Sequence, residues 1–584
     1  MRYKNRNRGS GLLLVLFFGL VLGTITALLL RQAVFQRRAN ARFSIRKEEQ
    51  NASEYALNKM ISEIQFLGTY KPVQVGGEIN NFHNAVLGVS PPRIPGFEIS
   101  EASVTCIEGD NLQYANISDT SHEWYGYPAM RIVYRLEVRA RKKDSPFNEP
   151  GVKLRRDVEV LNIPLYVFGI FYDNMLEIWP GPAFSMRGRV HSNSDIWLGS
   201  GNRADYYERI TSAGNIFHGR APKSGQSGGD SPVYIFNGSE LKNMRQSDGT
   251  WLDSQARNWV SRSMALWNGY VMDKAHGLKP IRLPIPSYQN PHTLIERADP
   301  VNDEPSLRDI KFEYKADLKI ARDPRTNAIV ASDKNGNNLL LTYPDPKNPN
   351  ATKSIIKEST FYNYREGKTI RSLDLNLGNL IESGIDIGNG IIYISEEPSG
   401  TGGSQTQPAV RILNGSRVPA TLTGGLSIAT DDPLYVQGDF NAGANRRQVL
   451  LAGDSINILS NAWNDARQVN SASFSLQRAS ATETNAIFMA GNVGTGKYGT
   501  HYSGGAENYF RYLENWSGIR HTFRGSMLNL WESMTALGKW VYGGKHYEAP
   551  NRDWYWDNVL GGIAPPPGML SFFQVNPLQW DIVP

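Results

Sequence analysis

Close to its first residue, the chain has a long apolar run. Residues 11–30 read GLLLVLFFGLVLGTITALLL and carry no charged side chain. About 20 apolar residues, each rising 1.5 Å along a helix, span the hydrocarbon core of a bilayer. The pattern predicts a membrane anchor from Gly11 to Leu30 that includes Gly11, Leu12, Leu13, Leu14, Val15, Leu16, Phe17, Phe18, Leu20 and Leu30.

A helical pattern continues beyond the anchor. Ala52, Ala56, Met60 and Ile64 recur at every fourth position, and no glycine or proline occurs between Gly23 and Gly68. This spacing predicts one helix over residues 11–67, about 85 Å long. Its first third is expected in lipid and its last third against a soluble domain. The apolar core of a secretory signal is shorter, so we expect the anchor to be retained.

After the helix, apolar and charged residues alternate with a period of two. In Met130–Arg141, apolar residues at even positions alternate with mostly charged residues at odd positions. This pattern predicts a strand with one solvated face. Phe97–Cys106 and Val152–Leu161 are expected as its neighbours in a small antiparallel sheet, within a domain covering residues 68–178.

From about residue 179 the pattern changes to short apolar runs separated by Gly, Asn, Ser and Asp. Examples are NGIIYIS, AVRILNGS and QVLLAGDSINILSN. Such units bury their apolar faces by stacking on one another. We expect a parallel β-helix over residues 179–220 and 385–525, with an inserted α+β subdomain over residues 221–384. The predicted fold is therefore mainly β with an N-terminal α+β part, and a β-sandwich is the alternative for the body.

Residues 526–584 are rich in aromatic side chains. A cap on an open end of the stack is the favoured interpretation, because large rings bury much area. The functional alternative is a platform for a sugar or a partner protein, made by Trp540, Trp554 and Trp556.

Charge and cysteine content narrow the class of protein. The formal net charge is +6, and much of the excess lies in the first 47 residues, so no nucleic-acid partner is expected. The one cysteine, Cys106, cannot form an internal disulfide, which fits a bacterial envelope protein. Basic residues lie on both sides of the anchor, so counting them leaves its orientation open. The short basic leader (residues 1–10) and the large body favour a body outside the cytoplasm.

The basic leader, the junction Arg8-Gly9-Ser10, the apolar helix and the sheet together resemble a type IV prepilin. More narrowly, they resemble PilX-type minor pilins and pseudopilin-like proteins. Further similar segments are FYNYREGKTIRSLDLNLGNL at 361–380, LYVQGDFNAG at 434–443, AGDSINILSNAWND at 452–465 and PPPGMLSFF at 565–573. The resemblance implies prepilin peptidase and other pilin-like subunits as partners, with cleavage between Gly9 and Ser10. Most pilins carry a glutamate at the fifth mature position, which is Leu14 here. An unprocessed signal anchor is the alternative.

Candidate chemistry is sparse. Gly491–Lys497 matches G-x-x-x-x-G-K, but Tyr498 follows where a phosphate loop has Ser or Thr, so a glycine-rich turn is expected. Asp431 and Asp432 are adjacent and precede Pro433, which indicates a turn rather than a hydrolase pair. The histidines lack metal-ligand spacing. We therefore predict no catalytic residues, no metal and no cofactor.

These features favour a non-enzymatic subunit of a type IV pilus or related envelope filament, at its tip or as its initiator. Its expected location is the bacterial inner membrane, as a single-pass protein. The alternative is a membrane-anchored β-helical protein that binds or cleaves polysaccharide. The sequence does not identify a surface ligand.

Overall fold

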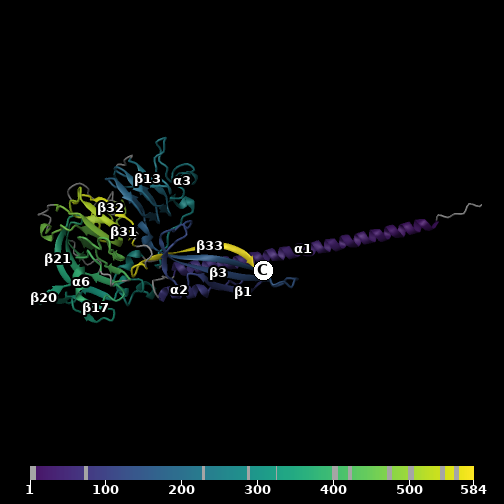
Figure 1. The fold of residues 1–584 in the computed structure, drawn as a ribbon, viewed down its shortest axis with the longest axis horizontal. Coiled ribbons are helices and arrows are strands. Elements are labelled where there is room, and N and C mark those ends of the chain that lie inside the picture. The colour runs from purple at the N-terminus through teal and green to yellow at the C-terminus, as the bar shows by residue number, and fades with distance from the viewer. Residues whose placement is uncertain are drawn as a thin grey trace, which may run out of the picture.

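The computed structural model describes residues 8–70, 77–226, 231–285, 290–323, 325–396, 405–418, 422, 424–469, 476–496, 505–538, 546–557, 559 and 564–583. The fold is mainly β, with one long helix at the N-terminal side. Helix α1 (Arg8–Tyr70) has 63 residues, about 95 Å in length. Figure 1 shows that most of it projects from the body as a free rod. The predicted continuous helix is confirmed.

The last third of α1 packs on an antiparallel sheet in the order β1-β3-β4-β33. The members are β1 (Phe97–Glu108), β3 (Pro128–Lys142), β4 (Val152–Pro164) and β33 (Ser571–Val583), with β2 (Tyr114–Asn116) beside β3 and α2 (Gly77–Leu87) near β1. Ala56, Met60 and Ile64 are buried against Tyr134 and Leu136, so the helical stripe and the apolar face of β3 form one core. The three predicted strands are confirmed. The fourth, β33, was not predicted, because it comes from the other end of the sequence.

The first part of the body consists of short parallel strands that recur about every 20 residues. Leu176 pairs with Ile196, and Ile196 pairs with Ile216; all three are buried. Alternate residues of each strand therefore point into a shared core. These strands are β5 (Phe168–Tyr172), β6 (Leu176–Ile178), β7 (Phe184–Met186), β8 (Arg189–Ser192), β9 (Ile196–Leu198), β10 (Ala204–Tyr206), β11 (Ile210–Ser212) and β12 (Ile216–His218).

The C-terminal part of the body repeats this arrangement with strands that alternate between two sheets. One set is β23 (Ile391–Ser395), β25 (Leu426–Ala429), β27 (Val449–Ala452), β29 (Thr482–Gly491) and β31 (Arg520–Trp531). The other is β22 (Lys368–Asn376), β24 (Thr406–Leu413), β26 (Leu434–Gln437), β28 (Ile456–Leu459) and β30 (Phe510–Tyr512). Neighbours within each set pair in parallel, as the sequence predicts.

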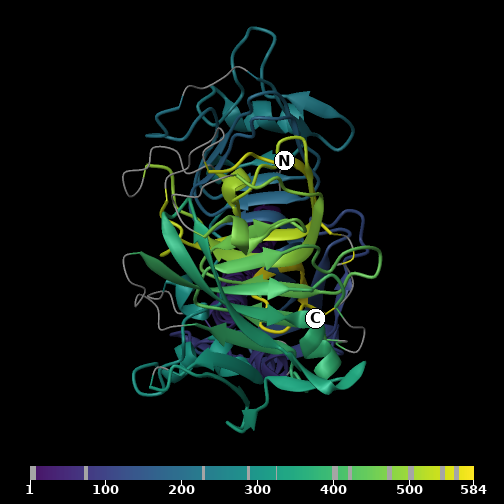
Figure 2. The same cartoon turned by 90° about the vertical axis from the view of Figure 1, so that its left-hand side faces the viewer.

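The two parts share one large sheet. Its strand order runs β15-β11-β8-β5-β31-β29-β27-β25-β23-β16. The chain thus enters the stack in its middle at β5, builds one half, crosses to the far end and returns to the middle at β31. Figure 2 shows the strands as successive rows, with blue strands above, green below and the yellow β31 between them.

This order corrects two expectations. Residues 526–584 do not cap an open end, because β31 lies between β29 and β5 and β33 joins β4. Residues 221–384 are no separate insert, because β13 pairs with β10, β15 with β11, and β16 with β23. The elements concerned are β13 (Val233–Phe236), β14 (Leu241–Asn243), α3 (Trp259–Trp267), β15 (Val271–Met272), η2 (Lys274–His276), η3 (Pro291–Leu294), α4 (Pro305–Arg308), α5 (Phe312–Lys315), β16 (Leu318–Arg322), β17 (Ile329–Asp333), β18 (Asn338–Leu339), β19 (Thr342–Asp345), β20 (Asn348–Ser354), β21 (Ile356–Asn363) and α6 (Leu377–Ser383).

The segment between β15 and β16 crosses the outer face of the large sheet. Its Leu283, Ile295 and Phe312 share a core with Leu450 and Leu528 on that sheet. The remaining elements are η1 (Leu165–Val167), η4 (Asp465–Arg467), η6 (Ala506–Asn508) and β32 (Asn551–Tyr555). The stack extends crosswise to α1, so the molecule has a wide head on a thin rod (Figures 1 and 2).

Candidate functional site

A continuous run of exposed apolar side chains belongs to the projecting part of α1. Leu12 is 69% exposed, Phe17 65% and Leu30 63%, although such side chains are normally buried. Moving one Leu or Phe side chain out of water is worth about 1.5–3 kcal/mol. The exposed large side chains of this surface are Leu12, Leu13, Leu14, Val15, Leu16, Phe17, Phe18, Leu20, Leu22, Ile25, Leu28, Leu29 and Leu30. In an isolated chain in water, these apolar side chains would therefore remain unfavourably exposed.

The polar groups of this segment are satisfied within the helix. Thr24 Oγ1 donates to the carbonyls of Val21 at 2.8 Å and Leu20 at 3.0 Å, and Thr26 Oγ1 donates to that of Leu22 at 2.8 Å. Every polar group in a lipid environment needs such an internal partner. Within the described residues, α1 contains the one helix that is long and apolar enough to cross a bilayer. These properties suit an environment of lipid or of other apolar helices.

The junction that resembles a prepilin cleavage site lies at the start of this helix. Gly9 and Ser10 belong to the first turn of α1, which begins at Arg8. Residues 1–7 lie outside the described residues. Cleavage between Gly9 and Ser10 remains a prediction.

Two buried polar side chains fix α1 to the sheet. Ser53 Oγ donates to the carbonyl of Val152 at 2.8 Å and accepts from the amide of Ala140 at 3.0 Å, so one hydroxyl joins the ends of β3 and β4. Glu49 Oε1 accepts from the amide of Lys142 at 3.0 Å. Sequence reasoning missed both residues, because their partners lie about 90 positions away.

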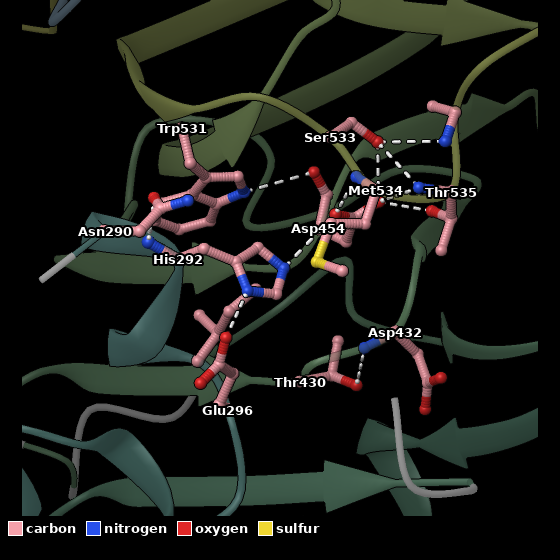
Figure 3. A network of polar contacts seen from close by, with 12 residues as sticks. Asn290, His292, Glu296, Thr430, Asp432, Asp454, Trp531, Ser533, Met534 and Thr535 are labelled. Carbon is pink, nitrogen blue, oxygen red and sulfur yellow. Dashed lines mark hydrogen bonds and ion pairs between the residues drawn. The ribbon is translucent and has the colours of Figure 1, made fainter. Parts of the chain in front are cut away.

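A buried polar cluster holds the crossing segment against the stack (Figure 3). Asp454, between β27 and β28, accepts from Ser533 Oγ at 2.6 Å, from the amides of Met534 at 2.7 Å and Thr535 at 3.0 Å, and from Thr535 Oγ1. His292 Nε2 lies 3.3 Å from Asp454 Oδ1, at ion-pair distance but outside hydrogen-bond geometry. We call these residues the Asp454 cluster.

Charge balance keeps His292 protonated. Burial opposes the positive charge of His292. The carboxylates of Asp454 and Glu296 outweigh this effect and raise the pKa of His292 to about 9; Glu296 Oε1 lies 2.9 Å from His292 Nδ1. Burial also opposes the charge of Asp454, yet the donors around it and His292 lower its pKa. The Asp454 cluster is therefore a compensated ion pair.

The Asp454 cluster contains Ser, His and Asp side chains but lacks the order of a catalytic triad. A triad needs the histidine between the hydroxyl and the carboxylate. Here Ser533 donates to Asp454, and His292 contacts Asp454 and Glu296. All the groups have partners inside the protein, so this arrangement stabilises the fold and has no nucleophile activated by a base.

Asp431 and Asp432 lie at the bend between β25 and β26, as expected for a turn. Both are buried. Asp431 Oδ1 accepts from Ser395 Oγ at 2.7 Å, and Asp432 Oδ2 accepts from the amide of Glu396 at 2.8 Å. Each carboxylate thus binds the corresponding bend of the neighbouring turn of the stack.

The glycine-rich segment from Gly491 begins at the last residue of β29. Thr495 Oγ1 donates to Glu177 Oε2 at 2.7 Å, so this turn lies against a buried carboxylate, which would repel a phosphate. Lys497 and Tyr498 lie outside the described residues. The described part of the segment agrees with a turn between strands.

The predicted aromatic platform is wrong for Trp554. This side chain is 1% exposed and packs inside the stack, with ring centroids 5.3 Å from Phe510 and 6.3 Å from Phe184. Trp556 is partly buried and donates to the carbonyl of Tyr166 at 2.5 Å. Trp540 lies outside the described residues. Because the Trp554 ring fills internal space, it offers no surface to a sugar.

Metal chemistry gains no candidate from the structure. Among the described ranges, no three His, Cys, Asp or Glu side chains gather in a way that would hold a metal ion.

Comparison with known proteins gives little further information. No protein-family model matches the chain, and no curated protein matches it. Among solved structures, the chain is similar to the competence-associated pilin ComZ from Thermus thermophilus, at 10% sequence identity over 93% of this chain and 96% of that chain, with a TM-score of 0.26. A TM-score of this size does not establish a shared fold.

Proposed function

We propose that the chain is a non-enzymatic, pilin-like subunit of a bacterial type IV pilus or related envelope filament. The observation that carries the proposal is the continuous helix α1, whose first third is apolar and exposed and whose last third packs on an antiparallel sheet. The apolar first third is held in the inner membrane and then packs against the helices of other pilin-like subunits. The body, which we interpret as a parallel β-helix, is displayed outside the cytoplasm.

The helix surface fits packing against other helices. Gly19 and Gly23 are four residues apart, and a Cβ atom added at either would meet nothing within 4 Å. Small residues at this spacing allow helix backbones to approach closely in lipid. This feature supports association through α1 beyond simple anchoring.

The shape of the body favours a place at the filament tip or in its initiation. The stack extends crosswise to the rod, so the head is much wider than α1 (Figure 1). Heads of this width would collide if they were repeated along a tightly packed shaft. Leu14 in place of the usual glutamate agrees with this position. We further propose that the chain is related to PilX-type minor pilins. The alternative of a polysaccharide-binding protein loses its main support with the burial of Trp554.

Mass spectrometry of the protein purified from a strain that contains prepilin peptidase tests the assembly route. We expect a mature chain that begins at Ser10, and we expect a Gly9→Glu variant to keep the preceding residues. A Gly11→Ala variant, altered just beyond the junction, is the matched control and should be processed. Recovery of the wild-type protein with Gly9 still attached would contradict the proposed processing.

A further inference from the structure

A cavity of about 1090 Å³ lies where the N-terminal sheet meets the stack. Its floor is the outer face of β8 and β11, because Arg189 and His191 alternate with the inward-facing Val190. Its walls come from the last turns of α1, from β33 and from residues 277–282. A cavity of this size is comparable to the sites that hold small molecules.

Two arginines lie side by side on this floor. Val190 pairs with Ile210, and the amide of Val190 donates to the carbonyl of Arg209 at 2.9 Å, so Arg209, directly before β11, lies beside Arg189 of β8. Arg209 Nη1 donates to the carbonyl of Gly269 at 3.2 Å. Arg189 and Arg209 thus both line the cavity, from adjacent turns of the stack.

Arg189 is held in place but not fully partnered. Its guanidinium lies between the rings of Trp124 and Tyr127, at 4.3 and 4.4 Å from their centroids, and Nη2 donates to the carbonyl of Glu123. Although Arg189 is only 6% exposed, its Nε has no hydrogen-bond partner among the described residues. A buried charged group with an unused donor is costly unless something binds it.

The charges around the cavity do not balance. In the described ranges, no ion pair within 4.0 Å joins Arg189 or Arg209 to a carboxylate. Burial raises the pKa of Glu208 while both arginines act to lower it, and Glu123 on the cavity wall acts on Arg189, so two carboxylates face the two cations at longer range. Lys279 adds a further positive charge at the wall. The excess is positive, which favours an anionic ligand.

We propose that this cavity binds an oxyanion, a carboxylate or a phosphate, on the paired guanidinium groups of Arg189 and Arg209. The planar donor fork of arginine matches both kinds of oxyanion. The aromatic wall formed by Trp124, Phe168 and Phe572 would contact an apolar group that carries the anion. The proposal does not depend on the filament role.

Isothermal titration of the full-length protein in detergent, at low ionic strength with chloride as the only other anion, tests the site. The two probes are inorganic phosphate and N-acetylglutamate. We expect saturable binding of at least one probe, weakened about tenfold or more in Arg209→Ala. Arg203→Ala is the matched control, since Arg203 is exposed and pairs with Asp205 at 2.7 Å, and binding should be unchanged.

The two probes distinguish the sources of the ligand. Binding of phosphate alone indicates a phosphate-bearing ligand, and binding of N-acetylglutamate alone indicates a carboxylate-bearing one. No saturable binding of either probe, or equal binding by the wild type and Arg209→Ala, would overturn the proposal. An Arg189→Lys variant keeps the charge but loses the donor fork and should also bind weakly; if it does not fold, the Arg209→Ala comparison decides alone.

Discussion

Asp454 illustrates how single buried residues join parts of the chain that are distant in sequence. Its carboxylate binds residues 533–535 and faces His292, so one side chain links three segments. Nothing local in the sequence identifies such a residue, because each partner is about 80 positions or more away. The same holds for Ser53 and for the arginines of the cavity. Asp431 and Asp432 were interpretable because the adjacent proline marks a turn.

The His292–Asp454 ion pair predicts a specific pH dependence of stability. The pKa of His292 in the folded state, about 9, lies above its ordinary value of 6.5. Its contribution, on the order of 3 kcal/mol, is therefore fully present below pH 6.5 and is lost as the pH rises through 9. Burial raises the pKa of Glu514 from its ordinary 4.5 to about 7. The stability linked to the Glu514 proton is therefore lost as the pH rises from 4.5 through 7, below the range in which His292 titrates.

Urea unfolding of the full-length protein in detergent at pH 6, 7.5 and 9.5 measures this effect. The free energy of unfolding of the wild type should fall between pH 7.5 and 9.5. His292→Gln should be less stable than the wild type at pH 6 and should show a smaller fall. If the free energy of unfolding of His292→Gln fell as much as that of the wild type between pH 7.5 and 9.5, another group would be responsible for the fall.

At the scale of elements, the helices and strands with a regular hydrophobic period were predicted from the sequence. The pairing between strands distant in the sequence was not. The helix over 11–67 and the strand from Met130 were clear because their patterns repeat over many residues. The short apolar runs predicted parallel stacking but not which runs are neighbours. A cap was expected at the C-terminal end because large aromatic residues suggest burial without indicating where. The structure uses that end to complete the N-terminal sheet.

Removal of β33 should therefore weaken the N-terminal sheet. A chain ending at Leu570 loses the pairing with β4, and it loses Phe572 and Phe573, whose rings lie 5.9 Å from Trp124 and 4.7 Å from Phe82. Loss of a buried Phe side chain typically costs about 3–5 kcal/mol. Hydrogen exchange followed by mass spectrometry should show faster exchange in β3, β4 and the last third of α1.

Protection in β25 and β27 should persist in that truncated chain, because neither strand pairs with β33. A chain that lacks only Pro584, the residue after the end of β33, is the matched control and should exchange like the wild type. Unchanged protection of β4 in the longer truncation would show that the sheet is stable without its fourth strand.

At the scale of the whole molecule, the arrangement separates two tasks. The apolar first third of α1 needs lipid or other helices around it, whereas the crosswise stack has its own core and needs neither (Figures 1 and 2). The sheet between them holds the helix and the chain's last strand together. In the proposed role, α1 joins the filament and the stack is carried as a head whose width restricts it to an end.

The location of the head on cells tests this account most directly. Immunogold labelling with an antibody against the stack should place the protein at the ends of surface filaments in wild-type cells. Cells that produce the unprocessed Gly9→Glu variant should show label at the membrane alone. Label confined to the membrane in wild-type cells, or spread evenly along filament shafts, would contradict the account.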